Sequence, residues 1–423
     1  MQEDFIHFLW KFKKFDVLNV KTIDGKPLQI FDVGQHNHNS GPDFFNAKIK
    51  IGEQLWAGNV EIHLKSSDWY AHHHETDKAY DNVILHVVWA HDADIFRKNK
   101  SVVPTLELKN FVPSQLLKNY HQLFSAKKRW IPCENNFAEV DDFILDNWKE
   151  RLYIERLERK SQQIDVLLNQ TRQHWEEVLF RMLFRNFGLK VNADAFESVA
   201  KSIDFSIVRK LQSNPLELEA LFLGQAGLLD ATIEDAYFIQ LKNTYKYLSQ
   251  KFSLQNTAAA QVQFFRLRPS NFPTIRLVQL AQLYSEHYNL FSNVIATNRL
   301  TNFYELFQVG VSEYWKTHYT FQTSSTTSEK RLTKSFIDLL LINTIIPLKY
   351  CYNHQKGVLE TEEIFELANA IKPEDNSIIK KFNSLKPVVK NAMDSQAFLQ
   401  LKNNYCDSKK CLHCAIGCAL ITN

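Results

Sequence analysis

The hydrophobic pattern of this chain changes its period roughly one-third of the way along. Up to about residue 125, short apolar runs such as "PLQIFDV", "DFFNAKIKI" and "NVILHVVWA" are separated by turn signals, which is typical of strands. After about residue 140, apolar residues recur at helical spacing almost to the end. We therefore predict an α/β N-terminal domain with a mixed sheet at 1–126, a linker at 127–142, and a large all-α domain at 143–423.

Composition excludes several classes of protein. Apolar residues make up 45% of the chain and include 31 Phe, which is enough for packed cores and argues against disorder. The net charge of +3 means that any nucleic-acid surface would be a local basic patch. Neither GxGxxG nor GxxxxGK[ST] occurs, so the sequence disfavours a Rossmann or P-loop enzyme. The N-terminus lacks signal-peptide features and no apolar run reaches membrane-spanning length, so we expect a cytoplasmic protein without a membrane partner.

The stretch from 41 to 63 alternates like a hairpin but carries Asp43, Glu61 and His63. We predict a three-residue turn at 52–54, with Ile51 opposite Leu55, which would place Asp43 opposite His63 and all three polar side chains on one face. A bulge at Gly58 would shift the register by one residue and separate them. Alternatively, Asp43 caps a turn, and Glu61 and His63 form an ordinary solvated face.

Histidines are concentrated around this hairpin, with eight of the 15 lying between residues 36 and 91. Two carboxylates and an imidazole on a sheet edge can bind a divalent cation that activates a water molecule. We predict Mg²⁺ or Mn²⁺ there, with Asp43 and Glu61 as ligands and His63 as a base or third ligand. His36, His38 and His74 are candidate auxiliary ligands, whereas an ordinary core role is favoured for His86.

The order of these elements resembles the PD-(D/E)XK nuclease core. In that superfamily two acids bind Mg²⁺ and the lysine of the last triplet orients the attacking water. Pro42-Asp43 matches the first acid and Glu61 the second. His63 stands where the lysine would be, and Lys65 lies two residues further on the same face. The resemblance implies nucleic-acid hydrolysis with Asp43, Glu61, His63 and Lys65 as catalytic residues.

A second resemblance covers nearly the whole chain. The stretches "HNSGPDFFNAKI", "GNVEIHLKSSDW", "FRLRPSNFPTIRL" and "YCDSKKCLHCAIG" resemble those of an uncharacterised bacterial family, the domain of unknown function 2851 proteins. This resemblance implies no particular activity.

Clustered cysteines close the sequence with the spacing C-x4-C-x2-C-x3-C. In a chain expected to stay in the cytoplasm, such a cluster favours metal ligation over disulfides. Either a structural zinc ion or an iron–sulfur cluster is compatible with the spacing. Some nucleases of the PD-(D/E)XK class carry an iron–sulfur centre built from one remote and three clustered cysteines, and this arrangement is similar. The candidate ligands are Cys133, Cys406, Cys411, Cys414 and Cys418, with the fourth ligand open between Cys133 and Cys418.

Arginines and aromatic residues alternate in "FFRLRPSNFPTIRL", which makes Arg266, Arg268 and Arg276 candidate nucleic-acid contacts. Alternatively, the aromatic residues belong to a core and the arginines pair with carboxylates. The functional hypothesis is a divalent-metal-dependent nuclease. Its alternatives are a non-catalytic nucleic-acid- or protein-binding scaffold on a degenerate nuclease core, and a metal-dependent hydrolase of a small substrate.

Overall fold

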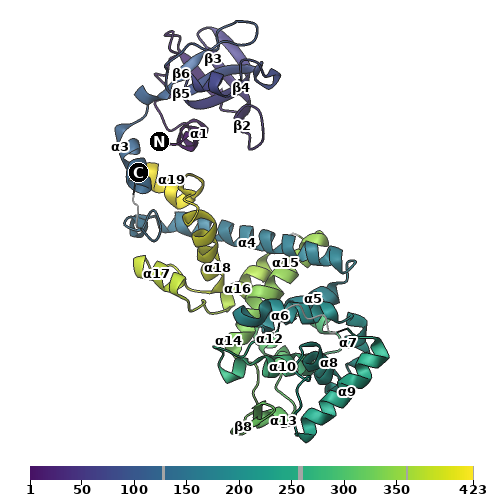
Figure 1. The fold of residues 1–423 in the computed structure, drawn as a ribbon. Helices are drawn as coiled ribbons and strands as arrows, with labels where there is room; N and C mark the ends of the chain where they lie inside the picture. The colour runs from purple at the N-terminus through teal and green to yellow at the C-terminus, as the bar shows by residue number, and fades with distance from the viewer. Residues whose placement is uncertain (126–128, 256–260, 359–360, 423) are drawn as a thin grey trace. The chain divides into compact units, whose positions relative to one another are not determined.

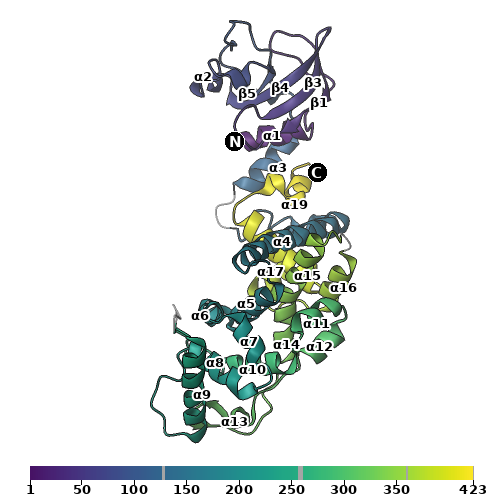
Figure 2. The same cartoon turned by 90° about the vertical axis from the view of Figure 1, so that its right-hand side faces the viewer.

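The chain divides into two compact units (Figures 1 and 2). The computed structural model describes residues 1–125, 129–255, 261–358 and 361–422. Unit 1 comprises Met1–Trp148 and Leu401–Asn423, and unit 2 comprises Lys149–Gln400. The predicted linker at 127–142, of which positions 127 and 128 lie outside the described residues, precedes this division.

The C-terminal segment belongs to unit 1, whereas we had predicted it as the end of the helical domain. Its last helix, α19 (Ala415–Thr422), packs against α3 (Ser114–Phe124), and the Asn119 side-chain amide donates to the Ile421 carbonyl at 3.2 Å. Figure 1 shows α3 and α19 side by side near the C-terminus. Sequence periodicity identifies such a helix but carries no information about which distant helix it packs against.

Unit 1 is built on a mixed six-stranded sheet, as predicted. The strand order is β1-β3-β4-β5-β6, with β2 paired to the edge of β3. The pairs formed by β1, β2 and β4 with β3 are antiparallel, whereas β4–β5 and β5–β6 are parallel. The strands are β1 Leu28–Asp32, β2 Gln35–His36, β3 Phe44–Ile51, β4 Gln54–Lys65, β5 Val83–Ala90 and β6 Thr105–Glu107.

Two helices place functional side chains on this sheet. Helix α1 (Glu3–Lys11) buries Phe5, Phe8 and Leu9 at helical spacing and packs against β4 (Figure 2). The short helix α2 (Asp68–Ala71) lies in the crossover from β4 to the parallel strand β5, as parallel pairing requires. Trp69 anchors this crossover, because it is fully buried against Tyr80.

Unit 2 is almost entirely helical, which confirms the helical region expected from the sequence. Phe180, Phe184 and Phe222 pack ring against ring in its core. A small hairpin of β7 (His318–Thr320) and β8 (Thr323–Ser324) interrupts the helices. The helices are α4 Asp142–Gln170, which starts in unit 1, α5 Trp175–Phe187, α6 Leu189–Ser202, α7 Phe205–Leu211, α8 Pro215–Gln225, α9 Ala236–Phe252, α10 Pro273–Glu286, α11 Leu290–Ala296, α12 Leu300–Leu306, α13 Glu313–Lys316, α14 Lys334–Leu340, α15 Ile346–Gln355, α16 Glu362–Ala370, α17 Ser377–Leu385 and α18 Ala392–Leu401.

Within the described residues, a single continuous helical stretch, Lys334–Gln355, has the length and apolar composition of a membrane span. Two-thirds of its apolar window is buried inside the protein (67%). The buried core helix of a soluble protein meets the same criteria, so the stretch is weak evidence for a membrane segment.

Candidate metal centre

The hairpin of β3 and β4 brings Asp43, Glu61 and His63 together by a different register from the predicted one. The turn contains two residues instead of three, because Ile51 pairs with Gln54, so the predicted pairing is wrong by one residue at the turn. A bulge between Phe44 and Ala47 adds a second residue, and Asn46 there has a φ of 60°, a left-handed conformation that asparagine tolerates.

The two shifts add up to an even number. Phe44 pairs with Val60, where the predicted register would pair it with Ile62. A shift of two residues keeps every side chain on the same face of the strand, whereas a shift of one would exchange the faces. The three polar side chains therefore stay on one face, with Glu61 beside His63, while the Asp43 carboxylate groups with Glu3 and His7. The bulge lies at Asn46 and not at Gly58. At Gly58 a Cβ would lie 2.4 Å from Ile84 Cγ2, so glycine allows β4 to approach β5.

Asp43 and Glu61 are joined through the backbone. The Asp43 amide donates to Glu61 Oε2 at 3.2 Å, and the Ile62 amide donates to Asp43 Oδ2 at 2.9 Å. These bonds fix both carboxylates at the end of the hairpin. Glu61 is buried, with 4% of its surface exposed, and burial followed by the charge of Asp43 raises its pKa well above the usual range.

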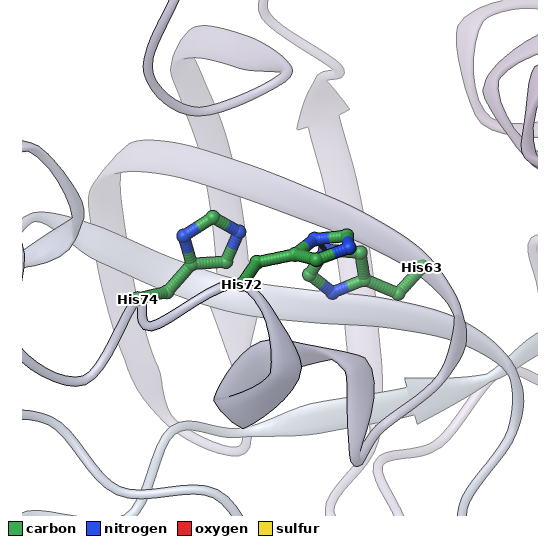
Figure 3. Close-up of side chains that lie close together, drawn as sticks. All are labelled: His63, His72 and His74. Atoms are coloured by element: carbon green, nitrogen blue, oxygen red, sulfur yellow. Dashed lines mark hydrogen bonds between the residues drawn. The ribbon is translucent and has the colours of Figure 1, made fainter.

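Three imidazoles meet beside Glu61. The Nε2 of His63 lies 3.1 Å from His72 Nδ1, and one ring nitrogen from each of His63, His72 and His74 lies within 4.8 Å of the others. Glu61 Oε1 lies 3.4 Å from His63 Nε2 and 3.2 Å from His74 Nε2. Figure 3 shows the three side chains gathered together, with His63 from β4 and the other two from the segment after α2.

The segment after α2 can supply two ligands because of its backbone conformation. His73 has a φ of 60°, so the chain turns at this residue. His72 and His74 both face the cluster, while His73 is exposed. His72 is also exposed, which leaves the group of imidazoles open to solvent on one side.

A second group of possible ligands adjoins the first. Glu3, His7 and Asp43 each offer an atom within 4.8 Å of the others. Glu3 and His7 lie one helical turn apart on α1, and His7 Nε2 is 3.4 Å from Asp43 Oδ2. Burial alone would lower the pKa of His7, but the Asp43 carboxylate outweighs it and the pKa is raised. Asp43 therefore connects the two groups through its bonds to His7 and to the Glu61 strand.

The electrostatics of the imidazoles suit metal ligation. Burial, followed by the charges of His74 and His72, lowers the pKa of His63 to about 3, and burial also lowers that of His74. Both rings are therefore neutral at pH 7, as metal ligands must be. His74 Nε2 and His7 Nε2 are buried, and each lies beside a carboxylate oxygen, that of Glu61 at 3.2 Å and that of Asp43 at 3.4 Å. A cation at either group could be bound by the ring nitrogen and the carboxylate together.

His86 contacts the ring nitrogen of His63 that does not face Glu61. Its Nε2 lies 2.9 Å from His63 Nδ1, and it is fully buried, so its role is in the core beside the cluster. If His63 carries its proton on Nδ1, it donates to His86 and its Nε2 lone pair faces Glu61. Such a partner behind a ligand histidine fixes the ring and its tautomer.

The structure places the other predicted residues of this region outside the two groups. His36 stacks on Phe44 with ring centroids 4.7 Å apart, and the exposed His38 lies beside it at 4.4 Å. Among the described residues, neither belongs to a group of converging ligand atoms. Lys65 is exposed, its backbone amide donates to Asp68 Oδ2 at 2.9 Å, and its charge acts on Asp92.

Sequence reasoning missed Glu3, His7 and His72. The i, i+4 spacing of Glu3 and His7 on an amphipathic helix was a visible signal, but only the packing of α1 on the sheet brings them to Asp43. His72 adjoins His74 in a run of three histidines, and the left-handed conformation of His73 between them is not visible in the sequence.

The candidate ligands Cys133, Cys406, Cys411, Cys414 and Cys418 all lie in unit 1, but no three of these described residues have sulfur atoms within 4.8 Å of one another. Burial raises the pKa of the Cys133 thiol, and the charges of Cys414 and Cys411 raise it further. The Cys406 thiol is affected in the same way by burial and then by Cys133, Cys414 and Cys411, so these four thiols lie within electrostatic range of one another. The Cys418 thiol lies within the same range of Cys411 and Cys414, and its Sγ is also 3.2 Å from the Leu412 carbonyl oxygen.

The three arginines lie in unit 2, where Arg268 and Arg276 line the same cavity and Arg266 does not. Arg266 and Arg268 are exposed on the segment before α10, and the Arg266 guanidinium lies over the Phe265 ring at 5.0 Å. Arg276 is buried in the first turns of α10. They do not form one continuous basic surface patch.

The fold and the cluster define a class of protein: a mixed-sheet unit with a buried histidine–carboxylate centre, followed in the chain by a helical unit. This chain belongs to the family described as protein of unknown function DUF2851, whose model matches residues 3–377. No curated protein and no solved structure matches the chain.

Proposed function

We propose that this protein is a divalent-metal-dependent phosphodiesterase that acts on nucleic acid, with the cluster around Glu61 as its active site. The observation that carries the proposal is the convergence of Glu61, His63, His72 and His74 beside the central strand β4. Neutral imidazoles with one carboxylate are ligands for Mn²⁺ or Zn²⁺, and more carboxylate-rich sites suit Mg²⁺.

The topology of unit 1 supports a nuclease-like core. A helix precedes the antiparallel strands, an acid lies at the start of β3 and another within β4, and a crossover leads to the parallel strand β5. This is the order of elements on which the resemblance to the PD-(D/E)XK core rests. Lys65 is exposed and its charge acts on Asp92, so we assign to the histidines the role that lysine has in that superfamily.

Each residue of the centre has a role that follows from its contacts. A divalent cation held by Glu61 and the three histidines would supply Lewis-acid activation of a phosphoryl group and of water. Asp43 orients Glu61 through its backbone amide and holds His7 through its carboxylate. His7, whose pKa is raised, can carry a proton to the leaving oxygen.

A cavity next to His7 provides room for substrate. Its volume is about 400 Å³, and it is lined by residues of α1, β2 and the C-terminal segment. Lys11 contributes a positive charge to the lining and Asp4 a carboxylate, while Phe8 and Phe12 contribute aromatic rings. Burial lowers the pKa of His36 to about 4 and lowers that of His413 too, so both rings are neutral. A lysine beside aromatic rings suits a phosphate attached to a base.

The test offers single- and double-stranded DNA and RNA to the purified full-length protein with Mn²⁺, Mg²⁺ or Zn²⁺. The proposal predicts metal-dependent cleavage that is lost in Glu61→Gln and His74→Gln but kept in Glu53→Gln. Glu53 is the matched control, because it lies at the turn of the same hairpin with its side chain 99% exposed. Cleavage that survives Glu61→Gln would place the activity elsewhere.

A second candidate function is hydrolysis of a small phosphorylated molecule at the same centre. The volume of the cavity favours it, because about 400 Å³ lies within the usual range for small-ligand pockets. Turnover of a chromogenic phosphodiester without cleavage of any nucleic acid would select this candidate. Salt-sensitive nucleic-acid binding without turnover of either substrate would instead select the non-catalytic scaffold.

The proposal includes a structural zinc ion or iron–sulfur cluster held by Cys133, Cys406, Cys411 and Cys414. Support comes from the mutual effects of these thiols on one another's pKa and from the C-x4-C-x2-C spacing. The contact of Cys418 with Leu412 favours Cys133 as the fourth ligand. Such a centre would join residue 133 to the C-terminal segment, and the reduced thiols that it needs suit the cytoplasm.

A further inference from the structure

Unit 2 contains a cavity whose base is a buried arginine. The cavity has a volume of about 770 Å³ and lies between the segment that leads into α10, the first turns of α10 and α14, and the chain that precedes α14. Arg276 lines it with only 6% of its surface exposed. All of the lining residues belong to unit 2 and none to the centre around Glu61.

The positive charge of Arg276 has no counter-ion among the described residues. Its Nη1 donates to Gln279 Oε1 at 2.8 Å and its Nη2 to Asn271 Oδ1 at 2.5 Å, and both acceptors are neutral amides. The guanidinium carbon lies 3.6 Å from the centroid of the Phe336 ring, and Nε is buried without a hydrogen-bond partner. Burial lowers the pKa of this guanidinium well below its usual range. An unpaired buried charge is costly unless an anion accompanies it.

The rest of the lining adds positive charge. Arg268, Lys330 and Arg331 line the cavity, against a single carboxylate, Glu329. That carboxylate lies 3.1 Å from Lys316 Nζ, a cation that it shares with Glu313. Lys330 directs its ammonium group to the carbonyls of Trp315 and Lys316, so Arg268 and Arg331 are the cations left to a ligand.

We propose that this cavity binds the phosphate group of a small phosphorylated molecule, with Arg276 at its base and Arg268 and Arg331 at its mouth. Guanidinium groups match the geometry of phosphate oxygens, and the hydroxyls of Thr333 and Ser335 in the lining can donate to the same group. A volume of about 770 Å³ accommodates a ligand of nucleotide size. A buried arginine in a cavity is reached by a small ligand more readily than by a duplex, so the site is distinct from a nucleic-acid surface.

The experiment measures binding to the full-length protein by isothermal titration calorimetry. The ligands are inorganic phosphate, adenosine monophosphate, adenosine as the uncharged control, and a single-stranded oligonucleotide without terminal phosphate. The site predicts saturable binding of adenosine monophosphate that weakens as salt is raised, with weaker binding of inorganic phosphate and none of adenosine.

The variants distinguish binding in this cavity from nonspecific attraction of the ligand to positive charge. Arg276→Gln should weaken adenosine monophosphate binding about tenfold or more, because it removes charge-assisted hydrogen bonds. Arg266→Gln is the matched control, since Arg266 is exposed on the same segment and does not line the cavity. If Arg276→Gln does not fold, as judged by circular dichroism, the surface variant Arg268→Gln/Arg331→Gln carries the test and should also weaken binding.

Equal affinity in the wild type and in whichever variant folds would overturn the proposal. Absence of saturable binding of both phosphate ligands at millimolar concentration would overturn it too, as would binding of the oligonucleotide alone. The last result would assign these arginines to a nucleic-acid surface instead.

Discussion

Replacing Glu61 with glutamine should separate the stability of unit 1 from its capacity to bind metal. Glutamine has the shape of glutamate, so its carbonyl oxygen can accept the hydrogen bond from the Asp43 amide that now reaches Glu61 Oε2 at 3.2 Å. Its amide group would face His63 Nε2 and His74 Nε2, which lie 3.4 Å and 3.2 Å from Glu61 Oε1, and can donate to one of them. The metal-free variant should therefore be at least as stable as the metal-free wild type.

The effect of metal should differ between the two proteins. A cation present at about 100 times its Kd stabilises the folded state by about 2.7 kcal/mol. For a unit of roughly 170 residues, 1 kcal/mol shifts Tm by about 2–4 °C, so the wild type should gain about 5–11 °C with Mn²⁺. Glu61→Gln lacks the carboxylate ligand and should gain almost nothing, because an amide is a poor replacement for a charged ligand.

Thermal unfolding followed by circular dichroism, with and without Mn²⁺, measures both quantities. Glu53→Gln makes the same chemical change on the same hairpin and should behave like the wild type, since its side chain is 99% exposed. An equal gain in Tm for Glu61→Gln and the wild type would refute the assignment of Glu61 as a ligand. A large loss of stability in the metal-free variant would refute the isosteric argument.

Three further predictions concern other parts of the chain. Cys133→Ser should lower the zinc or iron content measured by elemental analysis, whereas Cys418→Ser should leave it unchanged because the Cys418 thiol contacts the Leu412 carbonyl; equal losses would contradict the ligand set. Gly58→Ala should lower the free energy of unfolding, measured by urea denaturation, by about 1–3 kcal/mol, because the new Cβ would lie 2.4 Å from Ile84 Cγ2 and 2.7 Å from the Asn82 carbonyl oxygen. An unchanged urea midpoint would show that β4 and β5 can separate at no cost in free energy. Burial lowers the pKa of Lys349 from 10.5 to about 8, so between pH 8 and pH 10.5 the unfolded chain binds more protons than the folded chain. The stability of the wild type relative to Lys349→Met should therefore increase as the pH rises from 8 to 10.5, and a constant difference in Tm would contradict the shift.

The hairpin shows how far sequence alone predicts this site. Strand alternation was enough to place Glu61 and His63 on one face, since that depends only on the two-residue period of a strand. The position of Asp43 depended on register, and both the turn length and the bulge at Asn46 differed from the prediction. Asp43 nevertheless lies on the same face as Glu61, because the turn length and the bulge each shift the register by one residue and together by two. A single error would have placed Asp43 on the opposite face.

The sequence alone did not predict which distant segments contact one another. The approach of Cys133 to the C-terminal cysteines depends on α19 packing against α3, and that of His7 to Asp43 depends on α1 packing on the sheet. Burial of Arg276 was equally hidden, because an arginine in an amphipathic helix is usually exposed. Local periodicity determines helices and strands, whereas the site is made by the packing of elements far apart in the chain.

The most direct test of the account is a titration of the protein with Mn²⁺, followed by the electron paramagnetic resonance signal of the free ion. Carboxylate and imidazole ligands hold Mn²⁺, whereas thiolates select softer metals, so the cysteines should not interfere. We predict saturable binding of about one ion per chain in the wild type and its loss in Glu61→Gln. A wild type that leaves all Mn²⁺ free, or a variant that binds it equally well, would contradict a metal centre on this sheet.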